Sequence, residues 1–226
     1  MNIDLYAYLL LGLFFFAIWL VCFYLRRDLR SMMWKTSLIG AVSGTISEYW
    51  YFQDYWLPPT IVGQGVPSPE DVLFGFAVMG VAAVALAVVT GKRFTASHTP
   101  RPFIFFLFFV SIFAGFAVFT DILGINSIYA FSLTMLLWTA GLLLLRPKMT
   151  LFAIGNGALL AIFSIIIYVA LLGVAVEYLQ RYWFLWGTPL GTTIFGGVPV
   201  TEIVWYFCLG TALAVVAPYA EGKGLK

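Results

Sequence analysis

Hydrophobic residues occur along this chain in seven long segments, separated by short polar stretches. We place the segments at residues 5–25, 32–52, 71–90, 103–121, 127–145, 150–178 and 200–218. Each one is long enough for a helix to cross about 30 Å of hydrocarbon. The sixth is long enough to tilt or to extend beyond the membrane. The pattern predicts an all-α integral membrane protein with seven transmembrane helices.

The composition agrees with this prediction, because 62% of the residues are hydrophobic and only 10% are charged. A soluble domain carries about 25% charged residues. Cys22 and Cys208 both lie inside apolar segments, which argues against a disulfide framework or a thiolate site. The first segment lacks a preceding basic stretch and is longer than a signal-peptide core, so we expect it to be retained.

Basic residues lie almost entirely on one side of the predicted membrane. Eleven of the twelve lysines and arginines follow the first, third, fifth or seventh segment, and only Arg181 falls on the other side. Positive residues concentrate on the cytoplasmic side of membrane proteins. We therefore expect a multi-pass protein of the cell (plasma) membrane, with the N-terminus outside and the C-terminus in the cytoplasm.

Acidic residues gather on the opposite side, at or near the outer ends of the segments. Asp4 and Asp54 fit simple solvation at the interface. Glu48, Glu177 and Glu202 fit it less well, since each is embedded in or beside an apolar run. An ionisable group in the middle of a membrane helix costs roughly 2.5–3.5 kcal/mol, so such residues are candidates for function.

The chain contains a short internal repeat. Residues 53–56 read QDYW and residues 180–183 read QRYW; each is followed by a glycine-rich loop, the triplet GVP and an acid that opens the next segment. Two three-helix units joined by one helix have the same orientation, as in parallel repeats. We expect a first repeat at residues 1–91, a linker with the fourth helix at 92–124, and a second repeat at 125–226. The glycines of the second and third segments (Gly40, Gly44, Gly75 and Gly80) are typical of close helix packing.

Aligning the two units places Asp71 opposite Glu202, and Glu70 opposite Thr201. One helical turn further, Phe74 corresponds to Trp205, with Tyr206 beside it. The repeat thus predicts carboxyl groups and aromatic rings in one apolar pocket. A carboxylic acid can protonate an alkene, and aromatic faces stabilise the carbocation that results. The competing interpretation is that Ser68, Glu70 and Asp71 only cap the third helix.

Other chemistries have little support in the sequence. The single histidine, His98, is predicted on the opposite side from the acids, which excludes a Ser-His-Asp triad or a histidine metal site there. Neither GxGxxG nor a P-loop occurs, and the seventh segment has no lysine for a retinal Schiff base. We therefore expect no cofactor, no metal and no nucleic-acid partner.

The order of these motifs resembles that of the membrane lycopene cyclases of the heterodimeric type, which are often fused into one chain. The first unit matches through its basic loop, Glu48, Trp56, GVP at 65–67, Glu70, Asp71 and Phe74. The second unit matches through Glu177, Trp183, GVP at 197–199, Glu202 and Phe207. The sequence departs from the family at three positions: one extra residue in PSPED at 67–71, Thr201 instead of a carboxylate, and Glu48 instead of aspartate.

The resemblance implies a cofactor-independent, redox-neutral isomerisation of a carotenoid end group in the lipid bilayer. The candidate catalytic residues are Glu70, Asp71, Glu202, Glu48 and Glu177. The residues expected to contact the substrate and stabilise its cation are Trp56, Phe74, Trp183, Trp205 and Tyr206. A divergent member of the family would instead hydrate an isoprenoid or only bind it.

A small-solute transporter is the alternative from another class of protein. Its arrangement of three, one and three helices with parallel repeats is the same. However, the Pro-Gln dipeptide typical of the sugar-efflux carriers is missing. The acids also lie near the outer ends of the segments, rather than at the midplane of the membrane.

Overall fold

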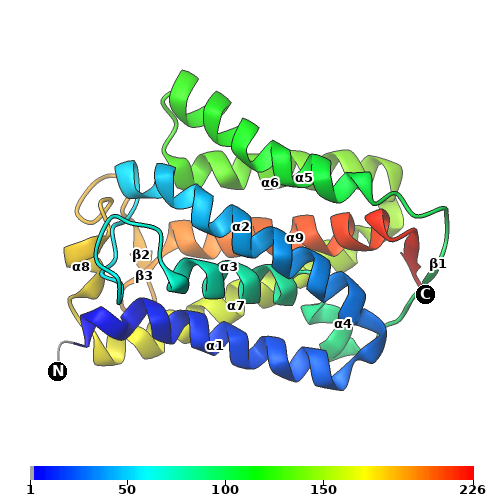
Figure 1. Ribbon diagram of the computed structural model, residues 1–226, viewed down its shortest axis with the longest axis horizontal. Coiled ribbons are helices and arrows are strands. Elements are labelled where there is room, and N and C mark those ends of the chain that lie inside the picture. The colour runs from blue at the N-terminus through cyan, green and yellow to red at the C-terminus, as the bar shows by residue number, and fades with distance from the viewer. Residues whose placement is uncertain (1–2) are drawn as a thin grey trace.

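The computed structural model describes residues 3–226 as a bundle of long helices that run side by side (Figure 1). The α-helices are α1 (Asp4–Leu25), α2 (Arg30–Asp54), α3 (Pro69–Ala82), α4 (Ala85–Thr90), α5 (Phe103–Gly115), α6 (Ser127–Leu145), α7 (Thr150–Val174), α8 (Tyr178–Tyr182) and α9 (Val200–Ala220). Single 3₁₀ turns, η1 (Arg27–Leu29) and η3 (Pro147–Met149), precede α2 and α7, and a π-helix, η2 (Phe116–Ile122), continues α5. Two short antiparallel pairs join β1 (Phe94–Ala96) to β4 (Lys223–Leu225) and β2 (Thr193–Ile194) to β3 (Val198–Pro199).

Five helical stretches within residues 3–226 are long and apolar enough to cross a membrane. They are Asp4–Leu25, Phe103–Ile122, Ser127–Leu145, Pro147–Val174 and Val200–Ala220. The composition and the lengths of the helices are thus those of an all-α membrane protein, as the sequence predicts. The second and third predicted segments do not belong to this set. Helix α2 is less apolar than the five, because serine, threonine and tyrosine recur along it, and the third segment is divided into α3 and α4, each too short to span.

The break between α3 and α4 corrects the continuous helix predicted at 71–90, and its cause is a side chain from α7. In an unbroken helix, Leu86 N–H would donate to Ala82 C=O. Here Asn156 stands between these groups: its Oδ1 accepts from Leu86 N (2.8 Å), and its Nδ2 donates to Ala82 O (2.7 Å). Nδ2 also donates to Gly210 O of α9 (2.8 Å). The amide therefore satisfies the backbone groups that the break exposes, as a membrane interior requires.

Glycines allow the closest helix contacts in the bundle. A Cβ atom on Gly40 of α2 would collide with Gly75 O of α3, and one on Gly75 would collide with Gly40 O. Gly157 of α7 lies in the same way against Phe207 O of α9. The close packing predicted for Gly40 and Gly75 is therefore confirmed.

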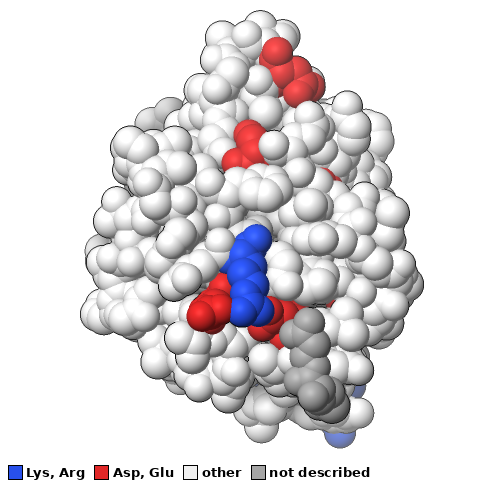
Figure 2. Space-filling model, turned by 90° about the vertical axis from the view of Figure 1, so that its left-hand side faces the viewer, with Lys and Arg blue, Asp and Glu red and all other residues white. Residues whose placement is uncertain are grey.

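The two ends of the bundle differ in charge. Helix α1 begins at one end and α9 finishes at the other (Figure 1). At the end where α1 begins, Arg181 pairs with Asp4 (Nη1 to Oδ2, 2.8 Å) and with Glu177. Figure 2 looks onto this end, where a basic side chain lies between acidic neighbours. The opposite end carries the β1–β4 pair and the 3₁₀ turns before α2 and α7, which contain Arg27 and Lys148.

Glu221, which follows α9, binds three residues at the end of the bundle opposite Arg181, which we call the basic end. It accepts hydrogen bonds from Ser31 Oγ (2.6 Å), Lys35 Nζ (2.7 Å) and Lys223 Nζ (2.6 Å). Burial alone would raise the pKa of this carboxyl group, but the donors outweigh burial and hold the pKa below its ordinary value of 4.5. The contribution of Glu221 to stability is therefore present above that ordinary value and is lost as the pH falls through the lower, folded-state pKa.

We expect Glu221→Gln to lower the melting temperature at neutral pH and to have no effect once the wild-type carboxyl group is protonated. Thermal unfolding in one detergent, followed from neutral pH down to about pH 3, measures the difference between the two proteins. A difference that stays constant over this range would contradict the ionised, hydrogen-bonded state of Glu221.

Candidate active site

The two tryptophan-containing loops meet at the acidic end of the bundle. Trp56 and Trp183 form an isolated antiparallel bridge. On either side of it, Leu57 N donates to Tyr182 O (2.8 Å) and Phe184 N donates to Tyr55 O (2.9 Å). The bridge joins the end of α2 to the end of α8, and so brings the two predicted halves of the site together.

Three acids from three different helices gather beneath this bridge. Glu48 of α2, Asp71 of α3 and Glu202 of α9 are 4%, 1% and 8% exposed. Glu48 interacts electrostatically with both of the others. Burying several carboxyl groups close to one another is expensive unless some of them are neutral. The structure thus contains an acid cluster, which we define as Glu48, Asp71 and Glu202.

Glu202 is held by phenol groups. Tyr55 OH donates to Glu202 Oε1, and Tyr168 of α7 also forms a hydrogen bond with this carboxyl group. Thr201 lies beside them, with its Oγ1 3.2 Å from Tyr55 OH. Donors aimed at a carboxyl group favour its ionised form. The surroundings of Glu202 therefore suit a proton acceptor.

Glu48 has different surroundings. Its Oε2 is buried and has no hydrogen-bond partner among the described residues. The contact that involves its carboxyl group is with the side chain of Trp56. A buried carboxylate with one oxygen left without a donor is costly, whereas a neutral carboxylic acid is tolerated. Glu48 is thus arranged as a proton donor, in contrast to Glu202.

Two small cavities adjoin the acid cluster. One, of about 30 Å³, is lined by Glu48 and Glu202 together with Tyr55, Trp56 and Tyr168. The other, of about 40 Å³, lies between α2, α3 and α6. Both are lined by Glu48, Tyr51, Phe74 and Trp205. Each is large enough for ordered water, but in this conformation neither accommodates the end group of a large hydrocarbon.

Asp71 has both a structural role and a place in the cluster. Its Oδ2 accepts from Ser68 N (2.7 Å), and its own N donates to Ser68 Oγ (3.3 Å), which forms a capping box at the start of α3. The phenol of Tyr8 interacts with the same carboxyl group. The capping interpretation of this motif is therefore correct for Asp71, and the acid also belongs to the cluster.

Two of the predicted acids lie outside the cluster. Glu70 Oε1 accepts from Ile61 N (2.8 Å), which fastens the loop that precedes α3, and Glu70 lines neither cavity. Glu177 is the N-cap residue of α8, and its side chain is 58% exposed and paired with Arg181. The sixth segment was predicted to extend to residue 178 and so to include Glu177, which is wrong, because α7 ends at Val174, before this residue.

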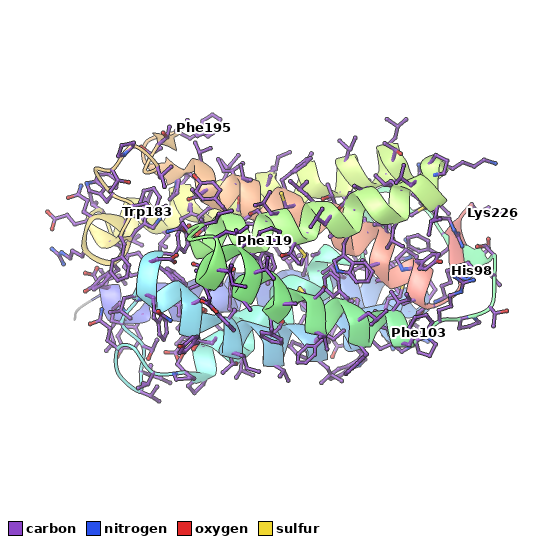
Figure 3. All side chains as sticks on the ribbon, turned by 90° about the horizontal axis from the view of Figure 1, so that it is seen from above. His98, Phe103, Phe119, Trp183, Phe195 and Lys226 are labelled. Carbon is purple, nitrogen blue, oxygen red and sulfur yellow. The ribbon has the colours of Figure 1, made fainter. Side chains whose placement is uncertain are left out.

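The predicted aromatic residues divide in a similar way. Trp56, Phe74 and Trp205 line the first cavity, and the rings of Phe74 and Trp205 stack with centroids 6.2 Å apart. Tyr206 lines neither cavity; its ring stacks on that of Phe15, with the centroids 5.3 Å apart. Trp183 is in the bridge and lines neither cavity. Figure 3 shows Trp183 and His98 at opposite ends of the helices, as predicted for the histidine.

Sequence reasoning missed the tyrosines around the acids. Tyr51 and Tyr55 follow Glu48 by three and seven residues, which places all three on one face of α2. Tyr51 OH accepts from Trp205 Nε1 (3.0 Å), and Tyr55 binds Glu202. Tyr168 reaches Glu202 from α7. The helical spacing from Glu48 could have indicated Tyr51 and Tyr55, whereas no neighbouring residue in the sequence indicates that Tyr168 belongs to the site.

No family model, no curated protein and no solved structure matches this chain. Across residues 3–226, no three histidine, cysteine or acidic side chains are grouped to hold a metal ion. What the geometry defines is an α-helical membrane protein with a buried cluster of carboxyl groups, surrounded by phenols and aromatic faces. Its chemistry has to be inferred from that cluster.

Proposed function

We propose that this protein is a membrane-bound cyclase of carotenoid end groups, of the lycopene cyclase type, and that it works by acid–base catalysis through a carbocation. The observation that carries the proposal is the burial of Glu48 beside both Asp71 and Glu202, with Glu48 and Glu202 in one cavity with Phe74 and Trp205. Paired carboxyl groups in different environments are a recurring arrangement for acid–base chemistry. The proposal places the substrate in the bilayer and requires no cofactor.

The reaction uses the two glutamates in complementary roles. Glu48 donates a proton to the terminal carbon–carbon double bond of the substrate. The electron pair of a second double bond in the same end group attacks the cation and forms the ring bond. Glu202 then removes a proton from a neighbouring carbon, which restores a double bond. The product is an isomer of the substrate, and the faces of Phe74 and Trp205 stabilise the intermediate cation.

The proposal includes seven membrane crossings in two parallel repeats, with the basic end in the cytoplasm. The bridge between Trp56 and Trp183 supports this arrangement, since its flanking hydrogen bonds are related by local two-fold symmetry. The helix connections support it too. Arg26 and Arg146 each end a helix, a single 3₁₀ turn follows, and α2 and α7 both have 25 residues. The repeats cover residues 1–91 and 125–226, and the linker covers 92–124.

The proton transfers make the proposal testable by isotope incorporation. Membranes that contain the protein are supplied with lycopene in D₂O buffer, and the pigments are analysed by mass spectrometry. Because the acid exchanges its proton with water, we expect one deuterium for each ring formed. A product heavier by one water molecule would instead assign the protein as a hydratase, which the two water-sized cavities beside Glu48 make the second candidate. Recovery of unlabelled lycopene alone would contradict both activities.

Tyr55→Phe tests the role of the phenol that binds Glu202. We expect the rate of ring formation to fall about 10- to 100-fold, since a hydrogen bond to a charged group contributes about 1.5–3 kcal/mol. Initial rates in isolated membranes measure the effect. Tyr178→Phe is the matched control, because Tyr178 is also buried but its hydroxyl has no partner among the residues the structure describes. Equal rates for the two variants would remove Tyr55 from the mechanism.

A further inference from the structure

An open groove runs along the outer surface between α5–η2 and α6. Its volume is about 490 Å³, within the range of roughly 300–1,000 Å³ typical of small-molecule sites. The residues that line it are mostly apolar and include Ala114, Val118, Phe119, Leu137, Gly141 and Leu145. The groove is therefore much larger than the cavities at the acid cluster, and most of the side chains that line it are apolar.

The few polar groups in the groove are already satisfied within the protein. Trp138 Nε1 donates to Ser111 Oγ (2.6 Å), and Ser111 Oγ donates to Phe108 O (2.8 Å). Thr134 Oγ1 donates to Ala130 O (2.9 Å). Each of these side chains thus already has a hydrogen-bond partner within the bundle. A ligand that carried polar groups would gain little here, whereas an unsubstituted hydrocarbon chain fits the lining.

Two aromatic residues next to the groove, Phe116 and Phe131, contact the aromatic residues around the acid cluster. Gly115, in the groove, is followed directly by the buried Phe116, whose ring lies 5.5 Å from that of Tyr51. Thr134, also in the groove, is one turn from Phe131, whose ring stacks on Trp205 at 5.1 Å. Tyr51, Phe131 and Trp205 line the second cavity. Phe116 also begins the π-helix η2, and such segments are frequent at functional sites.

We propose that this groove holds the hydrocarbon chain of the isoprenoid substrate, while one end group passes between Phe116 and Phe131 to reach Glu48. The inference rests on the proposed function and adds to it the site of the chain and the route of entry. A cavity of about 30–40 Å³ beside Glu48 leaves no room for the chain. The groove lies on the outer surface, where the bilayer would dissolve such a chain, and Phe116 and Phe131 connect it to Tyr51 and Trp205 beside the acids.

Substitutions that fill the groove test this assignment. Gly141 lines the groove, and a Cβ added to it meets no atom within 4 Å, so Gly141→Phe fills the groove without a clash near the backbone. Gly173→Phe is the matched control: Gly173 is an exposed helical glycine of α7, and it has the same freedom. Leu137→Trp is a second, independent way to fill the groove.

The probe is lycopene in bilayer nanodiscs, and its binding is measured by the circular dichroism that an achiral polyene acquires in a chiral site. We expect the wild type and Gly173→Phe to bind alike. Gly141→Phe and Leu137→Trp should bind at least about tenfold more weakly. Size-exclusion chromatography of each variant confirms that it remains folded.

The outcomes separate this inference from the proposed function. Unchanged binding by both groove variants, or no binding by the wild type, would overturn the groove as the substrate site. A groove variant that converts a dimer into a monomer would assign the groove to a second copy of the chain, and would also overturn it. Lycopene bound through the groove, without ring formation, would leave the inference standing and remove the cyclase activity.

Discussion

Glu202→Gln is expected to abolish ring formation while the protein still accumulates in membranes. Glutamine keeps the size of the side chain and can still accept a hydrogen bond from Tyr55, but it cannot take a proton from the substrate. General acid–base catalysis contributes about 10²- to 10⁴-fold to a rate, so a loss of this size is expected. The measurement is the rate of product formation per unit of membrane-inserted protein, with lycopene as substrate.

Glu177→Gln provides the control for this experiment. It makes the same chemical change at a carboxyl group that is exposed and paired with Arg181. We expect nearly full activity, since Glu177 lies outside the acid cluster. Ring formation that survives Glu202→Gln would exclude Glu202 as the proton acceptor. A loss that is equally large in both variants would show that the effect does not come from the cluster.

The largest loss of stability is expected from Asn156→Leu. Leucine has a similar size but no hydrogen-bonding group, so Leu86 N and Ala82 O lose their partner at the break between α3 and α4. Each buried polar group left unsatisfied costs about 1–3 kcal/mol, which gives roughly 2–5 kcal/mol in total. Joining α3 and α4 into one helix would avoid this cost only by displacing α4 from α7, on which it packs. A large fall in melting temperature in detergent would bear this out.

Thr36→Val is the matched control for Asn156→Leu. Thr36 is fully buried, and its hydroxyl donates to Met32 O and Met33 O of its own helix. Those carbonyl groups keep their helical N–H donors when the hydroxyl is removed, so the free energy of unfolding should change by less than about 1 kcal/mol. If the two variants unfolded at the same temperature, Asn156 would not be the group that maintains the break.

The fold was predictable where it depends on apolar length, and less so where it depends on tertiary contacts. Runs of apolar residues located the helices to within a few positions. They did not reveal the break after Ala82, since the sequence there is uniformly apolar and the cause is Asn156, which lies far away in the chain. The end of α7 at Val174 was likewise hidden inside an apolar run.

The candidate site was predictable in part for similar reasons. The repeat singled out Asp71 and Glu202, because both open a helix after the triplet GVP, and the structure buries both side chains. It misplaced Glu177, since the helix that would have buried this residue ends before it. From α7, the residue that reaches the cluster is Tyr168, which carries a phenol rather than a carboxyl group. Thr201, which stands where the resemblance implies a carboxylate, lies beside Tyr55 and Glu202.

The measurement that tests the central claim most directly is the pigment profile of lycopene-producing cells that express this protein. Immunodetection in the membrane fraction establishes that the protein is present, and chromatography with mass spectrometry identifies the pigments. The account predicts a new ring-bearing carotenoid with the mass of lycopene, formed by the wild type and lost with Glu202→Gln. An unchanged lycopene pool, with the wild-type protein present in the membranes, would contradict it.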